Sequence, residues 1–280
     1  MPNLPIDIIR HALAEDGAEA DITTLCTVPA EQQSQADIIV RQAGVIAGLA
    51  IATATFRELD SRVSFVLLVE DGAIVQAGQV VAHINGPARS VLSAERVALN
   101  FLGHLSGIAT LTAQCVRALE GTRARILDTR KTTPGLRSLE KEAVRLGGGH
   151  NHRFNLSDGV LIKDNHIKAA GDIVSAIILA RQQAPHLLKI EVECETLVEV
   201  QEALGAGADV ILLDNMPVDT MRSAVELVRH VAPKLLIEAS GNIGTNPAKL
   251  AAVAATGVDF ISLGAITHSA PNFDVSLDFT

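Results

Sequence analysis

The chain has 280 residues, of which 48% are hydrophobic and only 2% aromatic, and its formal charge is -9. This length suits two modest domains or one large one, each able to bury a core. The acidic balance disfavours DNA and anionic membranes as partners, and the scarcity of aromatic rings removes the stacking platforms used by single-stranded nucleic acids. The composition therefore indicates a globular protein that binds neither nucleic acid nor membrane.

Three features of the sequence bear on the cellular compartment of the protein. No apolar run is long enough to span a bilayer, and the first residues carry Asp7 and lack a signal-peptide pattern. Cys26, Cys115 and Cys194 have no paired spacing, which disfavours a disulfide framework and fits a reducing environment. We therefore expect a cytoplasmic protein.

The first part of the chain predicts strands at residues 37–42 and within 63–85. In the second stretch, Asp71-Gly72 lies between two apolar runs and is typical of a hairpin, and Gly78 indicates a further turn. Apolar residues then recur with helical spacing over residues 92–119. We expect this helix to link the two halves of the chain.

From about residue 123 onward, apolar runs alternate with helical segments. Thr196 and Glu199 form a capping-box pattern, and Asn246 precedes Pro247 as a helix cap precedes a first-turn proline. This alternation predicts parallel strands with crossover helices, and six units fall short of a closed eightfold barrel, so we expect an open or incomplete α/β barrel. The six runs are RILDTR, VLIKDN, KIEVE, VILLDN, LIEAS and FISLGA.

Each of these runs ends in polar or small residues. In a parallel barrel the carboxyl ends of all strands meet at one face, where active sites are built. A polar cap on any one strand is common, but six such ends together favour a functional site. The residues concerned are Asp128 to Lys131, Lys163 to Asn165, Glu193, Asp214 with Asn215, Ser240 to Asn242, and Gly264 with Ala265.

Basic residues gather in one segment of this acidic chain. Residues 96–168 hold twelve Lys/Arg and six Asp/Glu, a net charge of +6, so the remainder carries -15. Such a segment suggests a site for a small, multiply charged anion. Arg130, Lys131 and Lys163 lie at strand ends, where Arg offers a planar fork and Lys a point charge to carboxylate or phosphate. The basic residues in helical stretches are expected on solvated helix faces, namely Arg117, Lys141 and Arg145.

Two acids end the middle strands. Glu193 and Asp214 could bind Mg²⁺, ribose hydroxyls or a developing cation. A salt bridge to Lys163 or Arg130 is the alternative, and the two interpretations are compatible.

Small residues end the last two strands, as Ser240-Gly241-Asn242 and Leu263-Gly264. They let backbone N–H groups approach an anion, and late barrel loops often cradle phosphate. An ordinary turn is the alternative interpretation.

Weaker motifs lie around residue 150. Gly147 to Gly149 follow no strand and so form no dinucleotide fingerprint, and His150-Asn151-His152 lacks a third metal ligand with convincing spacing. We interpret the glycines as a loop and His152 as an anion contact. Cys194 alternates with Glu193 along its strand, so we expect it to face the core or the helix layer.

Several strings together resemble the quinolinate phosphoribosyltransferase family over about residues 20 to 270. They are ADITT (20–24), GPARSVLSAERVALNFLGHLSGIAT (86–110), DTRKTTPGLR (128–137), EAVRLGGGHNHRFNLSDGVLIKDNHI (142–167), EVE (191–193), LLDN (212–215) and EASGNI (238–243). The combination of DTRKTTPGLR with GGGHNHR and LIKDNH is highly specific. Ala20 and Asn242 depart from a pattern in which Gly is frequent, and neither change removes a charged group.

The resemblance implies an N-terminal α/β sandwich over residues 1–105, with the tail 270–280 packing on it, and an open α/β barrel over 106–269. It implies a homodimer in which the N-terminal domain of one chain closes the partner's barrel. It also implies the reaction: quinolinate and phosphoribosyl pyrophosphate give nicotinate mononucleotide, pyrophosphate and CO₂ in NAD biosynthesis, with Mg²⁺.

The resemblance also assigns residues. It implies that Lys131, Glu193 and Asp214 are catalytic, with the two acids beside ribose and Mg²⁺, reached through substrate and water. Arg96 would reach the quinolinate site from the partner subunit. The other substrate contacts would be Thr129, Arg130, His152, Arg153 and Lys163, and the phosphate contacts Ser240, Gly241, Asn242, Ser262, Leu263 and Gly264.

Other functions stay open at this point. A paralogue associated with molybdate transport operons resembles the same family, although the Asn-His-Arg string at 151–153 favours the quinolinate enzyme. A Schiff-base lyase with Lys163 as nucleophile is a second alternative, disfavoured by the surplus of arginine. A non-catalytic anion-binding protein is a third.

Overall fold

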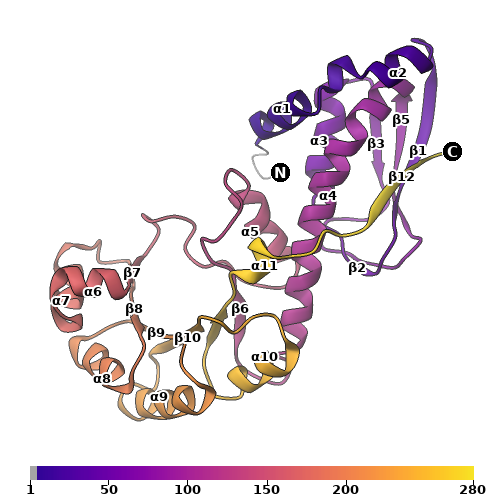
Figure 1. The fold of residues 1–280 in the computed structure, drawn as a ribbon. Coiled ribbons are helices and arrows are strands. Elements are labelled where there is room, and N and C mark those ends of the chain that lie inside the picture. Colours follow the sequence, from indigo (N-terminus) through magenta and orange to yellow (C-terminus); the bar gives the residue numbers. More distant parts are fainter. Residues whose placement is uncertain (1–4) are drawn as a thin grey trace. The chain divides into compact units, whose positions relative to one another are not determined.

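The computed structural model describes residues 5–280, which divide into two compact units (Figure 1). The first unit comprises the chain up to residue 113 together with 133–148 and 270–280. The second unit comprises 114–132 and 149–269. The long helix α4 (Ala88–Arg117) runs from the first unit into the second, in the region where the sequence predicts a linking helix.

The first unit contains a four-stranded antiparallel sheet in the order β12-β1-β5-β3. Along β1 (Gln33–Val40) the buried residues Ala36, Ile38 and Val40 alternate with more exposed ones, as in a sheet with one covered face. This mixed unit confirms the expected N-terminal α/β domain. Its other elements are α1 (Ile6–Glu15), η1 (Ala18–Ala20), α2 (Ile22–Thr27), β2 (Gly44–Val45), α3 (Leu49–Leu59), β3 (Ser64–Leu67), β4 (Ile74–Val75), β5 (Val80–Pro87), α5 (Arg137–Leu146) and β12 (Val275–Phe279).

The hairpin predicted across Asp71-Gly72 is wrong. β3 pairs with β5, whereas β4 pairs with β2, so the strands on either side of this dipeptide have different partners. The Asp71 carboxylate instead accepts a hydrogen bond at 2.9 Å from the backbone N–H of Leu49, at the start of α3. An Asp-Gly pair marks a turn without specifying which strands the turn joins. The turn predicted at Gly78, which has φ +84°, is confirmed between β4 and β5.

The second unit is an open barrel. Its six strands form one parallel sheet in the order β6-β11-β10-β9-β8-β7, which confirms the six predicted strands and the incomplete barrel. Helices cover the outer side of this curved sheet (Figure 1). The strands are β6 (Arg125–Leu127), β7 (Val160–Ile162), β8 (Ile190–Cys194), β9 (Val210–Asp214), β10 (Leu236–Ser240) and β11 (Phe260–Ser262), and the helices are α6 (Asp164–Ala170), α7 (Ile173–Gln183), α8 (Leu197–Ala206), α9 (Val218–Val231), α10 (Pro247–Ala254) and α11 (Ala265–His268).

The helix-start signals in the sequence are confirmed. Thr196 and Glu199 exchange both hydrogen bonds of a capping box at the start of α8. The Asn246 side chain accepts the backbone N–H of Lys249, and Pro247 opens α10. Over the part of the chain that the structure describes, no helix has both the length and the apolarity needed to cross a membrane.

Two aspartates in equivalent positions, Asp209 and Asp259, hold the amino ends of the barrel strands through hydrogen bonds and ion pairs. Asp209, just before β9, accepts the backbone N–H of Ile190 at 2.8 Å and pairs with Arg181 of α7 at 2.7 Å. Asp259, just before β11, accepts the N–H of Ile237 at 2.9 Å and pairs with an arginine of α9. These links fix strand to strand and strand to helix at the end of the sheet opposite the polar strand ends, so they brace the scaffold that carries them.

Side-chain burial agrees with the sequence for Cys194 but not for Lys141. All three cysteines are free thiols, and Cys194 is fully buried, as expected. Lys141, expected on a solvated helix face, is only 1% exposed on α5. The sequence shows the charge of a lysine but not the partners that the fold brings to it, and a buried lysine requires such partners.

Candidate active site

A cavity of about 500 Å³ opens among the carboxyl ends of the barrel strands. Parallel strands end at the same edge of a sheet, which is why residues from seven separate segments meet here. The structure brings together most of the predicted site residues in the wall of this one cavity. They are Thr129, Arg130, Lys131, His152, Arg153, Lys163, Glu193, Asp214, Ser240, Gly241, Asn242 and Ser262.

Three predicted residues lie elsewhere. Leu263 is buried, and its backbone N–H donates to the carbonyl of Leu127 at 2.9 Å. Gly264 precedes α11 and packs beside the Lys131 side chain. Arg96 is an exposed residue of α4 in the first unit, and its role across a subunit boundary stays a prediction.

One wall of the cavity is cationic, with Arg130, Lys131, Arg153 and Lys163. Burial and the like charge of Arg130 lower the pKa of Arg153, although a guanidinium keeps its proton at neutral pH. The Arg153 side chain is held by a 2.8 Å hydrogen bond from Nη1 to the carbonyl of Gly159. An anion bound between the two guanidinium groups would relieve their repulsion, so this wall is built for a ligand with carboxylates or phosphates.

Two carboxylates beside the cationic residues line the same cavity, those of Glu193 and Asp214. Glu193 Oε2 lies 2.7 Å from Nζ of Lys163, the salt bridge considered from sequence. The Asp214 carboxylate accepts a hydrogen bond from the side-chain amide of Asn215. Two carboxylates at a cavity fit Mg²⁺, which proteins bind through one or two carboxylates together with substrate phosphates and water.

The loop after β10 is closely packed against the loop after β9. Gly241 has φ +82°, and a Cβ at this position would lie 2.4 Å from Oδ1 of Asn215. Asn242 and Asn215 also adopt positive φ angles, 48° and 54°, and the Asn242 side-chain amide donates to Oδ1 of Asn215 at 2.9 Å. Only glycine fits at 241, and the loop therefore keeps a fixed backbone beside Asp214.

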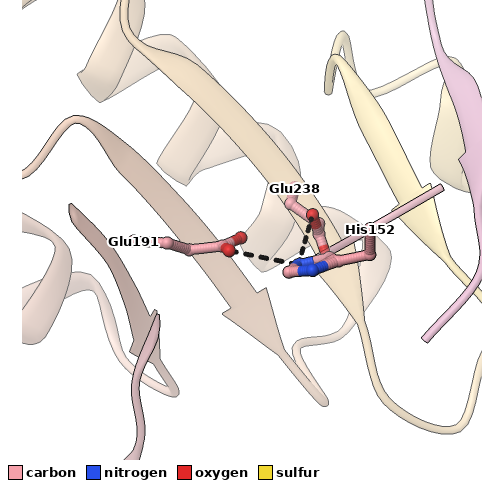
Figure 2. Close-up of side chains that lie close together, drawn as sticks. All are labelled: His152, Glu191 and Glu238. Atoms are coloured by element: carbon pink, nitrogen blue, oxygen red, sulfur yellow. Dashed lines mark ion pairs between the residues drawn. The ribbon is translucent and has the colours of Figure 1, made fainter. Parts of the chain in front are cut away.

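His152 and Glu238 both line the cavity. His152 there meets two acids of the barrel interior, Glu191 of β8 and Glu238 of β10 (Figure 2). Nε2 of the ring lies 3.1 Å from Glu191 Oε2 and 3.6 Å from Glu238 Oε2. Nδ1 accepts the backbone N–H of Arg153 at 2.7 Å. Both ring nitrogens therefore face protein groups in this structure.

This cluster contains strongly perturbed carboxyl groups. Burial, followed by the nearby Glu191 carboxylate, raises the pKa of Glu238 to about 8, so Glu238 is largely protonated at neutral pH. Burial also opposes a charged imidazole, but the hydrogen bond to Glu191 and the negative charge that the two acids share outweigh it and raise the pKa of His152.

Both parts of the chain match a known family. Residues 21–106 match the N-terminal domain of quinolinate phosphoribosyl transferase, and residues 108–278 match its C-terminal domain. The chain belongs to the quinolinate phosphoribosyl transferase family. The resemblance drawn from the sequence is thereby confirmed.

Relatives in this family are similar over nearly the whole chain. A probable nicotinate-nucleotide pyrophosphorylase (carboxylating) of Bacillus subtilis is 47% identical over 98% of this chain and 92% of its own. The nicotinate-nucleotide pyrophosphorylase (carboxylating) of Mycobacterium leprae is 45% identical over 97% of this chain and 96% of its own. The solved structure of NadC from Streptococcus pyogenes has a TM-score of 0.93 and 42% identity, covering 100% of this chain and 98% of that one.

In this member of the quinolinate phosphoribosyl transferase family, sequence reasoning missed Glu191 and Glu238. A signal was present, because each acid interrupts an apolar parallel strand two residues before a site residue, Glu193 or Ser240. Residues two apart on a strand face the same side, so an acid at that spacing lies on the site-facing side of the barrel. The direct contact predicted between His152 and a substrate carboxylate stays a prediction.

Proposed function

We propose that this protein is a carboxylating nicotinate-nucleotide pyrophosphorylase. It transfers the phosphoribosyl group of phosphoribosyl pyrophosphate to the ring nitrogen of quinolinate, releasing pyrophosphate and CO₂ and forming nicotinate mononucleotide for NAD biosynthesis. One observation carries the proposal: a single cavity of this family member brings together four cationic side chains, two carboxylates and a fixed glycine loop. A dicarboxylate ring and a sugar phosphate require these complementary charges.

The cationic wall would bind quinolinate. Arg130 and Arg153 offer planar forks to carboxylates, and Lys163 adds a point charge at the adjoining strand end. The pyridine nitrogen is a weak nucleophile, so holding both carboxylates fixes it in line with the anomeric carbon and supplies much of the rate enhancement.

The residues next to this anion site would bind phosphoribosyl pyrophosphate. Glu193 and Asp214 would lie beside the ribose, where their charge stabilises the positive charge that develops at the anomeric carbon. Lys131 would contact the pyrophosphate. The sugar phosphate would bind at the fixed loop of Ser240 to Asn242 and beside Ser262 to Gly264.

The bond changes balance without another reactant. The bond between the ring nitrogen and the anomeric carbon forms as the carbon–oxygen bond to pyrophosphate breaks. The alkylated, positive ring then accepts the electron pair of the neighbouring carbon–carboxylate bond, CO₂ leaves, and a proton takes its place on the ring. The side chains of the wall orient the ring and exclude water during these steps.

Three further properties belong to this proposal. Mg²⁺ would be held beside Glu193 and Asp214 through substrate and water, where it would neutralise charge on the pyrophosphate. A homodimer would place the partner's Arg96 at the quinolinate site, as the family resemblance implies. The three free cysteines support a reducing compartment, the cytoplasm.

The deciding experiment measures release of labelled CO₂ from carboxyl-labelled quinolinate, with and without phosphoribosyl pyrophosphate and Mg²⁺. Stoichiometric CO₂, pyrophosphate and nicotinate mononucleotide are expected only with all components present. Binding of phthalate, a carbocyclic analogue, without any turnover would instead indicate an anion-binding protein or the molybdate-associated paralogue. Trapping of a carbonyl substrate on Lys163 by borohydride would indicate the lyase.

A further inference from the structure

The acids Glu191 and Glu238 have no place in the chemistry described above. Glu191 is 8% exposed and Glu238 only 2%, and both point from their strands toward His152 (Figure 2). Two buried acids, one of them lining a cavity for a dianion, would repel that ligand, and burying carboxylates is costly in itself. Their presence at this position therefore calls for a function.

A metal ion is one reading of the cluster, because one nitrogen and two carboxylate oxygens lie within 4.8 Å of one another. The hydrogen bonding of His152 argues against it. Nδ1 accepts the Arg153 N–H, so a neutral ring carries its proton on Nε2, the nitrogen that faces both acids. A metal-binding Nε2 would need its lone pair free and a proton on Nδ1, the opposite tautomer.

A hydrogen-bonded cluster explains the same contacts. With its proton on Nε2, the ring donates to Glu191 and lies beside Glu238. Oε1 of each acid is buried without a hydrogen-bond partner among the described residues, and the two carboxyl groups are close enough to hydrogen-bond to each other. A protonated Glu238 supplies the donor for that bond and removes one negative charge from the lining of the cavity.

The ring in turn anchors the segment that carries Arg153. The backbone N–H of His152 donates to Oδ1 of the fully buried Asp128 at 2.8 Å, just after β6. The next N–H, that of Arg153, donates to the His152 ring. The guanidinium is held at its other end by the Gly159 carbonyl. Arg153 is thus fixed at both ends, and one of these two attachments depends on how the imidazole is oriented.

We propose that Glu191 and Glu238 are positioning residues that hold His152 with Nε2–H directed into the barrel, so that Nδ1 fixes the Arg153 backbone and the guanidinium is preset for a substrate carboxylate. This inference rests on the proposed function for the identity of that substrate, quinolinate. His152 then acts on quinolinate through Arg153. The two acids act on quinolinate through this ring, and Glu238 also lines the cavity.

The kinetic test compares Glu191→Ala with the more conservative Glu191→Gln, and Glu238→Ala with Glu238→Gln. Losing a hydrogen bond to a charged group is expected to raise the KM for quinolinate about tenfold or more in Glu191→Ala, with partial recovery in Glu191→Gln. The KM for phosphoribosyl pyrophosphate should change much less, because its binding side is untouched. Glu238→Gln should be close to wild type, since an amide replaces a protonated carboxyl, whereas Glu238→Ala should behave like Glu191→Ala.

Asp259→Asn is the matched control. It alters another buried barrel acid, 7% exposed, that braces the opposite end of the strands. It should lower the melting temperature at least as much as Glu191→Ala while leaving the quinolinate KM near that of wild type. An equal rise in the quinolinate KM in Asp259→Asn would show that general destabilisation explains the result, and would overturn the proposal.

A second readout is independent of turnover. In ¹⁵N-histidine-labelled wild-type protein, His152 should give a slowly exchanging, far-downfield Nε2–H proton signal, identified by its loss in His152→Asn. The signal should weaken or shift in Glu191→Gln and vanish in Glu191→Ala. A wild-type His152 protonated on Nδ1 alone, or a stoichiometric bound metal whose loss accompanies Glu191→Ala, would refute the positioning role. If wild type makes no product, the proposed function fails, while the NMR result still decides how His152 is held.

Discussion

Nζ of Lys163 lies 2.7 Å from Oε2 of Glu193, joining the ends of β7 and β8 at the wall of the cavity. The lysine side chain is 45% exposed and the glutamate 12%, so the acid depends on this partner more than the lysine does. Under the proposed function, a quinolinate carboxylate arriving at Lys163 would compete with Glu193 for the same ammonium group. Binding of the ring would then free Glu193 to face the ribose.

Replacing Lys163 should therefore impair both the binding of the quinolinate ring and the placement of Glu193 beside the ribose. We expect Lys163→Gln to lower kcat/KM for quinolinate by about 30-fold or more, because the largely buried carboxylate of Glu193 loses its charged partner. The control is Lys168→Gln, which removes an exposed lysine paired with Asp164 one turn along α6 and should change kcat/KM little. Steady-state kinetics with quinolinate varied measures both. Similar activity in the two variants would contradict the role of Lys163.

Arg130 provides a test of geometry in addition to charge. Arg130→Ala should raise the KM for quinolinate and weaken phthalate binding strongly. Arg130→Lys should recover only part of the loss, because lysine keeps the charge but lacks the planar fork. Calorimetric titration with phthalate gives the affinities, and Arg145→Ala, at an exposed helical arginine of α5, is the control. Full affinity in Arg130→Lys would mean that charge alone suffices.

The glycine loop predicts a selective loss of phosphoribosyl pyrophosphate binding. In Gly241→Ala the new Cβ would clash with Asn215, so the loop must move, and we expect the KM for phosphoribosyl pyrophosphate to rise about tenfold or more while phthalate binding persists. Gly244→Ala is a close match, with φ +69° but no atom within 4 Å of the added Cβ. It carries the same backbone strain without the clash. Equal kinetic effects in the two variants would rule out the loop contact.

Glu238 should leave a signature in the pH dependence of stability. Its pKa is raised to about 8 in the folded protein, so between its ordinary value and about 8 the folded state holds a proton that the unfolded state has lost. Stability from this group is therefore greatest at acidic pH and falls as the pH rises toward 8. Glu238→Gln removes this dependence, so its melting temperature relative to wild type should rise by several degrees between pH 5 and pH 8.5. A constant difference across this range would mean that Glu238 ionises normally.

The sequence predicted the barrel and most of its cavity because the relevant information is local. Each strand is a short apolar run, and most of the predicted cavity residues sit where such a run ends, as with Lys163 and Asp214, whereas His152 and Arg153 follow no predicted run and were assigned from the family resemblance. The His152 cluster is different, because Glu191 and Glu238 come from strands separated by β9 in the sheet. Only the curvature of the sheet brings such side chains together, and a linear pattern does not contain it. The misplaced hairpin at Asp71-Gly72 has a similar origin, since partner choice among short strands is set by the whole sheet.

The edge position of β12 has a consequence for how the protein is made. Val275 to Phe279 pair with β1, which lies more than two hundred residues earlier, and complete the sheet of the first unit. During synthesis β1 emerges early and keeps one open edge until β12 leaves the ribosome. That edge is a template for pairing with other chains. Premature termination just before β12 would thus yield a polypeptide with the complete barrel sequence but with the edge of β1 permanently unpaired and prone to aggregation.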